Sequence, residues 1–269
     1  MLIDTHCHLD AAEFDVDRDL VIAQAVQQGI SKIVIPSVTR NNFDAVIALC
    51  NQHKNCAYAL GVHPMYVDSA SGDDLETLKT YIEQYDPVAI GEIGLDYFVE
   101  GLDPKRQAFF FEAQLDLAQQ LNLPVIMHVR RSQDAILKAL RQRKITGGIA
   151  HAFNGSFQQA EQFLDLGFKL GFGGAATYPR ALQIRRLVSD LPLSALVIET
   201  DAPDIPPAWL REEGIHDNEP AFLPRIAKEL AELRNLEPAV FAQAVWQNAA
   251  EALPRWAPLL SSPHFPKVV

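Results

Sequence analysis

Short apolar runs alternate with longer amphipathic segments along most of this chain. Eight of the runs are only a few residues long and rich in Val, Ile, Leu and Ala, which is typical of parallel strands buried on both faces. The first run opens the chain, and the others lie at residues 31–36, 56–62, 88–93, 124–127, 147–150, 168–172 and 195–198.

Segments with helical periodicity follow these strands, with apolar residues recurring every three or four positions. We predict helices at residues 13–28, 41–53, 73–85, 103–121, 132–143, 156–166, 181–190, 221–233 and 238–252. Pro104 suits the first turn of its helix, and Gly29 suits a position just after a helix end.

This alternation predicts an α/β fold with a parallel sheet. Eight units in 269 residues predict a TIM (β/α)8 barrel with a single domain. An open doubly wound sheet is the alternative, but it usually carries a Gly-rich phosphate loop after a strand, whereas here the first strand ends in His6-x-His8. We expect the domain to span residues 1–257 and the Pro-rich tail, residues 258–269, to lie on the surface or be disordered.

Composition describes a soluble globular protein, with 48% hydrophobic and 21% charged residues. No apolar run reaches the ~18 residues of a membrane span, and no basic start precedes an apolar stretch. Cys7, Cys50 and Cys56 are scattered, which favours free thiols in a reducing compartment, although Cys50 and Cys56 could pair. We therefore expect a cytoplasmic protein without a signal peptide, membrane contact or an evident obligate protein partner.

The net charge of −11 argues against binding nucleic acid through a broadly basic surface. If the substrate is a phosphodiester, the attraction must be local. Bound divalent cations would supply it, because they are often the largest charges in a site.

Metal-capable side chains stand where predicted strands end. They are His6 and His8 on the first strand, His63 on the third, Glu92 on the fourth, His128 on the fifth, His151 on the sixth and Asp201 on the eighth. In a barrel, these ends meet at one mouth, where such enzymes keep their sites. A lone histidine at a strand end usually satisfies an ordinary hydrogen bond, but five of the eight histidines arriving with two carboxylates indicate a metal site.

The number of these side chains suits two cations rather than one. His6 and His8 share a strand face, because successive residues alternate sides. A catalytic zinc takes three protein ligands, so this set fits two metals with a carboxylate such as Glu92 between them. Two cations about 3.5–4 Å apart can clamp an in-line displacement and generate hydroxide. Asp201 is then a metal ligand or the general base, although it could also cap a helix. Zinc, manganese and magnesium all remain open.

Several motifs in order closely resemble the TatD-type metal-dependent deoxyribonucleases, a branch of the amidohydrolase superfamily. The motifs are LIDTHCHLD, GVHP, GEIGLDY, PVIMHVR, HAFNGS, IETDAP and NEPAFLPRIAKELAEL, which run from residue 2 to about residue 250. The resemblance implies a barrel with two metals, one held by His6, His8 and Asp201 and the other by His128 and His151, with Glu92 bridging. Many amidohydrolases bridge with a carboxylated lysine, so Glu92 favours the TatD-like branch.

Two departures from the family pattern concern contacts rather than ligands. The family often has Cys where Ala152 follows His151, and often Ser where Val129 follows His128. The second change puts some substrate contacts in doubt. By the resemblance, His63 is not a ligand; it would bind a phosphate oxygen or the leaving group, or simply form a turn before Pro64.

Other side chains are candidates for the surroundings of the metals. Glu199 shares parity with Asp201, so it should face the barrel interior and either orient a ligand or water or pair with a basic residue. A partly cationic rim would comprise Arg40, Arg130, Arg131 and Arg180, of which Arg130 is the best candidate for a phosphate contact. The aromatic residues on mouth loops, which could stack on bases or simply pack, are Tyr97, Phe98, Phe153 and Tyr178.

The leading hypothesis is a two-metal hydrolase that cuts phosphodiester bonds, acting as an exonuclease on single-stranded DNA as the resemblance implies. The alternative is the same barrel acting on a small phosphoester, ester, lactone or amide, which the acidic composition keeps open. A non-catalytic metal- or partner-binding protein is a third reading, and the completely filled ligand positions argue against it.

Overall fold

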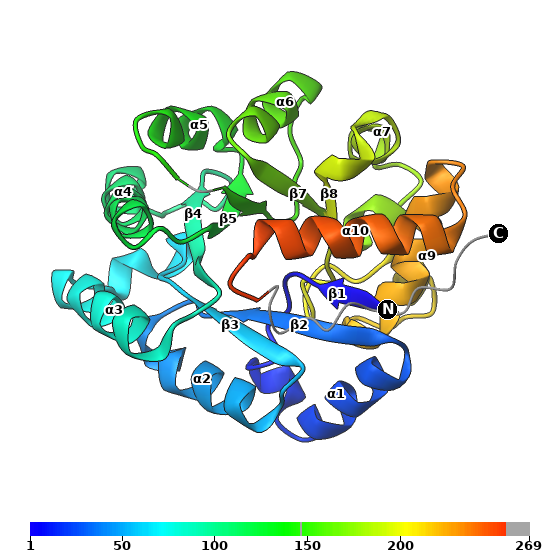
Figure 1. The fold of residues 1–269 in the computed structure, drawn as a ribbon, viewed down its shortest axis with the longest axis horizontal. Helices are drawn as coiled ribbons and strands as arrows, with labels where there is room; N and C mark the ends of the chain where they lie inside the picture. The colour runs from blue at the N-terminus through cyan, green and yellow to red at the C-terminus, as the bar shows by residue number, and fades with distance from the viewer. Residues whose placement is uncertain (146, 257–269) are drawn as a thin grey trace.

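A computed structural model describes residues 1–145 and 147–256 of the chain. Eight parallel strands form one sheet in which each strand neighbours the next along the chain, and helices surround it (Figure 1). The strands are β1 (Leu2–Asp4), β2 (Ile30–Pro36), β3 (Cys56–Leu60), β4 (Ala89–Asp96), β5 (Val125–Arg130), β6 (Gly148–Ala150), β7 (Phe168–Phe172) and β8 (Leu196–Ile198). The predicted TIM barrel is confirmed.

The barrel closes where the last strand meets the first. The backbone N–H of Thr5 donates to the carbonyl of Ile198 at 3.1 Å, and that of Asp201 donates to the carbonyl of His6 at 2.9 Å. These bonds join the ends of β1 and β8, so side chains that follow the two strands lie side by side.

Most predicted helices are present within a few residues of their expected bounds. The α-helices are α1 (Arg18–Gln27), α2 (Phe43–Gln52), α3 (Gly72–Tyr85), α4 (Pro104–Leu121), α5 (Gln133–Arg141), α6 (Phe157–Asp165), α7 (Leu182–Asp190), α8 (Ala208–Glu212), α9 (Leu223–Leu233) and α10 (Pro238–Ala252). Short 3-10 turns are η1 (Ala12–Phe14), η2 (Arg40–Asn42), η3 (Pro64–Ser69), η4 (Gly174–Thr177), η5 (Leu193–Ala195) and η6 (Pro220–Phe222).

Two apolar layers hold the barrel. The outer layer lies between the strands and the surrounding helices. The inner layer combines barrel residues such as Ile3, Val34 and Ile126 with Leu253 and Trp256, which follow α10. Figure 1 shows α10 crossing one end of the barrel. Because Val88 and Ala89 at the start of β4 belong to this inner layer, α10 closes the amino end of the strands and leaves the carboxyl end open.

The prediction was wrong at three places. The first helix begins at Arg18 rather than at residue 13, because the Arg18 guanidinium bonds the carbonyls of Leu9 and Ala11 and fixes the preceding segment as a turn. α8 was not predicted, since it is five residues long and lies in a Pro-rich stretch. β4 continues to Asp96 instead of ending at residue 93.

The extension of β4 depends on Gly94. Its φ is +154°, and a Cβ there would lie 2.0 Å from the carbonyl oxygen of His128 on β5. Only glycine allows this close approach, which pairs Asp96 with Arg130 in the strand register.

Three further expectations concern the chain as a whole. Cys7, Cys50 and Cys56 are buried free thiols, so no disulfide joins Cys50 to Cys56. Within residues 1–145 and 147–256, no helix is both long and apolar enough to cross a membrane. The expected tail at residues 258–269 lies outside the described residues.

Candidate metal centre

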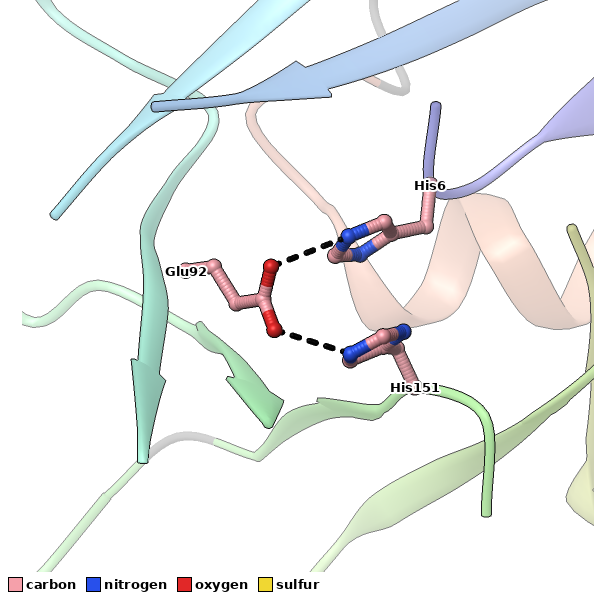
Figure 2. Close-up of side chains that lie close together, drawn as sticks. All are labelled: His6, Glu92 and His151. Carbon is pink, nitrogen blue, oxygen red and sulfur yellow. Dashed lines mark ion pairs between the residues drawn. The ribbon is translucent and has the colours of Figure 1, made fainter. Parts of the chain in front are cut away.

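The metal-capable side chains from six strands converge at the open end of the barrel around Glu92. This side chain is almost completely buried, with 1% of its surface exposed. Its two carboxylate oxygens face different sets of imidazoles, and Figure 2 shows His6 at one oxygen and His151 at the other. Glu92 therefore has the arrangement that a carboxylate between two cations requires.

The first set lies at Oε2 of Glu92. The Nε2 atoms of His6 and His8 are 3.1 and 3.6 Å from this oxygen and 3.2 Å from each other. Oδ1 of Asp201 completes the group at 3.5 Å from His6 and 3.7 Å from His8. The residues come from the ends of β1, β4 and β8, which the closed barrel brings together.

The second set lies at Oε1 of Glu92. Nε2 of His151 is 2.8 Å away, Nδ1 of His128 is 3.0 Å away and Nε2 of His63 is 3.2 Å away. Three histidines are therefore within reach of this oxygen, and distance alone does not show which of them could bind a cation.

Hydrogen bonds on the outer ring nitrogens distinguish these histidines. Nε2 of His128 lies 2.8 Å from Oδ2 of Asp96, an acceptor that keeps the proton of a neutral His128 on Nε2 and so leaves the Nδ1 lone pair facing Glu92. Nδ1 of His63 instead accepts the backbone N–H of Met65 at 3.2 Å. A neutral His63 then carries its proton on Nε2 and donates it to Glu92, which makes it a hydrogen-bond donor rather than a ligand.

Glu199 lies behind His151, as its parity with Asp201 predicts. Its Oε1 is 3.7 Å from Nδ1 of His151 and accepts the backbone N–H of Ala152. Within the described residues, no lysine or arginine pairs with Glu199, so its contacts support the orienting role over the paired one. Gly171 on β7 makes room for it, since a Cβ there would lie 2.2 Å from its Oε2.

The charges in this cluster are strongly coupled. Burial alone would raise the pKa of Glu92, but the imidazoles of His63, His151 and His6 lower it well below its usual range. Burial lowers the pKa of His6, whose ring stacks on that of His151 with centroids 3.8 Å apart. Burial also raises the pKa of Asp201 to about 6. Protonating every imidazole would place several like charges together, which a buried site resists.

The donor set fits divalent cations. His6, His8 and Asp201 form one group of converging ligand atoms, and Glu92 forms others with His6 and His151 and with His63 and His128. Buried Nδ1 of both His6 and His151 has no hydrogen-bond partner. Imidazole with carboxylate suits zinc or manganese and also allows magnesium.

A cavity of about 980 Å³ opens above the centre. His8, His63, Glu92, His128, His151 and Asp201 all line it. Two opposite parts of its lining differ in charge. We call Phe98, Arg130 and Arg131, which lie at or just after the ends of β4 and β5, the β4–β5 wall. We call Asp10, Glu13 and Asp204, which follow β1 and β8, the β8–β1 wall.

The expected cationic rim is only partly present. Arg130 and Arg131 line the cavity, whereas Arg40 does not and pairs with Asp74 at 3.4 Å. Arg180 is exposed but is not part of the lining. The rim prediction was wrong for these two residues, although Val38 and Ala175 of the same loops do line the cavity.

The mouth aromatics also differ from one another. Phe153 is 1% exposed and packs against Phe163, so it is a core residue and cannot stack on a base. Tyr178 is half-buried, and its hydroxyl donates to the carbonyl of Pro206 at 2.9 Å. Phe98 is 45% exposed and lines the cavity, and the side chain of Tyr97 beside it is 40% exposed.

Sequence reasoning missed Asp96 and Asp4. Asp96 bonds His128 and also accepts the backbone N–H groups of Phe98 and Val99, so it supports both the centre and the β4–β5 wall. The Asp inside the GEIGLDY motif was a usable signal, but ending the strand at residue 93 hid it.

Asp4 lies beneath the centre at the end of β1. It accepts hydrogen bonds from the backbone N–H and the hydroxyl of Thr200, and from the backbone N–H of His6. Burial raises the pKa of Asp4 to about 7. Asp4 therefore ties the His6 backbone to the segment that carries Asp201.

Comparison with known proteins agrees with this geometry. The family model described as TatD related DNase matches residues 3–254. An uncharacterized metal-dependent hydrolase of Escherichia coli K12, YjjV, is 39% identical over 91% of this chain and 95% of its own length. The crystal structure of that protein superposes with a TM-score of 0.88 at 38% identity, covering 94% of this chain and 98% of the other. A protein of Erwinia tasmaniensis named 3'-5' ssDNA/RNA exonuclease TatD is 33% identical over 92% of this chain and 98% of its own length.

Proposed function

Because this chain belongs to the family of TatD-related DNases and is a metal-dependent hydrolase, we propose that it cleaves phosphodiester bonds in single-stranded nucleic acid from one end. The Erwinia relative named as a single-strand exonuclease supports this substrate. The cavity of about 980 Å³ leaves room for more than a small ester.

The observation that carries the proposal is the two-sided environment of Glu92. One oxygen faces His6 and His8, and the other faces His128 and His151. We propose that His6, His8 and Asp201 hold one divalent cation, that His128 and His151 hold a second, and that Glu92 contacts both. When bound, such cations lower the pKa of water and polarise phosphoryl oxygens.

The remaining work falls to side chains of this chain. We propose that Asp201 takes a proton from the attacking water, because its carboxylate lines the cavity next to His6 and His8. With both oxygens of Glu92 engaged by cations, the Nε2 proton of His63 would be available for a hydrogen bond to a substrate oxygen instead of to Glu92. Asp96 and Glu199 would hold the rings of His128 and His151 in place.

A labelled oligonucleotide tests the function directly. End-labelled single-stranded DNA is incubated with the protein and magnesium, manganese or zinc, beside Asp201→Asn and a chelator. Exposed Asp165 at the end of α6 supplies a matched control, Asp165→Asn, with the same change of charge. We expect the wild type and the control to shorten the strand from one end, and Asp201→Asn or chelation to stop this. Intact DNA with metal-loaded wild type would reject the proposal.

A small-molecule hydrolase is the second candidate. The net charge of −11 and the carboxylates of the β8–β1 wall favour it, since both repel a long polyanion. The salt dependence of the activity distinguishes the two functions. The rate of cleavage of a nucleic-acid strand should fall steeply with added salt, whereas the rate of hydrolysis of a small ester should not.

Buried free thiols support a cytoplasmic location, which we also propose. Fractionation of cells followed by immunodetection tests it. Recovery in a membrane or extracellular fraction would contradict it.

A further inference from the structure

The two cavity walls face each other across the metal centre. The strands follow the order β1 to β8 around the barrel, which closes between β8 and β1. The ends of β4 and β5 therefore lie opposite the ends of β8 and β1. One wall carries two guanidinium groups and the other carries three carboxylates. A long anion bound at the centre can therefore extend over only one of them.

The two arginines are available to a ligand. Some other exposed arginines meet a carboxylate; Arg40 pairs with Asp74, for example, and Arg186 pairs with Asp190. Arg131 has no carboxylate within 4.0 Å among the described residues, and Arg130 only reaches Asp96, at 4.0 Å. Both guanidinium groups line the cavity without a close carboxylate partner in the part of the chain that the structure describes, so they are free to bind an anion there.

Their positions are fixed by the β4–β5 ladder. The N–H of Tyr97 donates to the carbonyl of Arg130 at 2.9 Å, and the Ser132 hydroxyl donates to the carbonyl of Leu95 at 2.6 Å. Arg131 between them has a φ of +55°, a conformation that non-glycine residues adopt only when their surroundings enforce it. The guanidinium groups are therefore presented by a rigid support.

Phe98 holds the two charges together. The guanidinium carbons of Arg130 and Arg131 lie 3.9 and 4.6 Å from the centre of its ring. Such contacts stabilise a cation. Because both guanidinium groups already occupy the ring, Phe98 supports the arginines rather than stacking on a base.

We propose that Arg130 and Arg131 bind a phosphate of the substrate strand next to the one at the metal centre, so that the strand leaves the site over the β4–β5 wall. This rests on the proposed nuclease function. An arginine pair suits this role, because each guanidinium can form two parallel hydrogen bonds to phosphate oxygens. The carboxylates of the β8–β1 wall would repel a strand on the other side, which suits action at an end.

The test compares substrates with one and with two phosphates. A dinucleoside monophosphate has only the scissile phosphate, whereas a trinucleotide with two internucleotide phosphates also has its neighbour. The variants are Arg131→Gln, the charge-conserving Arg131→Lys, and Arg40→Gln as a matched control outside the cavity. Metal content is measured for each.

For the wild type we expect kcat/KM at least about tenfold higher on the two-phosphate substrate. Arg131→Gln should abolish this advantage and leave the one-phosphate substrate within about twofold, while Arg131→Lys retains part of the advantage and Arg40→Gln retains all of it. Binding of a single-stranded oligonucleotide to chelator-treated protein should weaken about tenfold in Arg131→Gln. Its slope against the logarithm of salt concentration should become shallower by about 0.7.

Two failures are distinguishable. If the wild type cuts oligonucleotides and Arg131→Gln behaves as Arg40→Gln does, or loses activity equally on both substrates, the phosphate subsite is rejected and the nuclease function stands. If the metal-loaded wild type cuts neither substrate but hydrolyses a small ester, the nuclease function is rejected, and the subsite with it.

Discussion

The β4–β5 wall and the β8–β1 wall lie on opposite sides of one candidate metal centre but differ in charge and in support. On the first, Asp96 connects His128 to the Phe98 loop by hydrogen bonds, and the two guanidinium groups pack against the Phe98 ring. On the second, Asp4 connects His6 to Thr200, and the exposed Glu13 and Asp204 lie beyond that network. On both sides, a buried carboxylate supports one of the central histidines. The charge of each wall, in contrast, depends on residues at and beyond the strand ends.

Substituting Glu92, which lies between the two histidine sets, should have the largest effect on activity. Glu92→Gln leaves the shape nearly unchanged but removes the charge that faces both histidine sets. We expect kcat to fall by about 1000-fold or more and the protein to bind fewer than two cations. Steady-state kinetics and elemental analysis measure this. Full metal content with normal kcat would disprove the bridging role.

Changing the support on the β4–β5 side should have the next largest effect. Asp96→Asn weakens the acceptor of the His128 proton, and we expect metal affinity or activity to fall by about 10- to 100-fold. Metal titration of Asp96→Asn beside Asp165→Asn tests it. Equal affinities in the two variants would show that His128 needs no carboxylate behind it.

Filling the space beside Glu199, behind His151, should destabilise the folded protein. Gly171→Ala would place a methyl group 2.2 Å from Oε2 of Glu199. Overpacking of this kind costs about 1–3 kcal/mol of unfolding free energy. Urea denaturation of the variant measures it. A midpoint equal to that of the wild type would mean that Glu199 moves freely and does not orient His151.

Reversing one charge on the β8–β1 wall should have the smallest effect. Glu13 is exposed, so Glu13→Lys changes a screened interaction. We expect the variant to bind single-stranded oligonucleotide about two- to threefold more tightly at low salt, with the difference disappearing as salt is added. Weaker binding at low salt would contradict the repulsive role of this wall.

Much of the fold was readable from local patterns. β7 and α10 have the predicted bounds, since each combines a clear apolar period with strong end signals. The prediction that metal-capable side chains stand at strand ends also identified the side chains that lie around Glu92 in the structure. The prediction failed at β4, because a glycine such as Gly94 suggests a strand end and the sequence does not show how closely its backbone approaches His128. Asp96 was therefore not predicted as a site residue.

The role of an individual side chain at the mouth was less predictable. Phe98 and Phe153 looked alike in sequence, yet one lies beneath two guanidinium groups and the other is part of the core. His63 and His128 both reach the same oxygen of Glu92, and only their second hydrogen bonds distinguish the proposed donor, His63, from the proposed ligand, His128. Those partners are the Met65 backbone in η3 and Asp96 at the end of β4, and their positions depend on long-range packing.

The sequence by itself determined the barrel and the convergence of histidines and carboxylates at its carboxyl end, because strand periodicity fixes which residues end each strand and parallel order brings those ends together. The tertiary structure alone decided which oxygen of Glu92 each imidazole faces, which nitrogen is free, and where the mouth is cationic. These depend on distances of a few ångströms between residues far apart in the chain, and no local pattern encodes them.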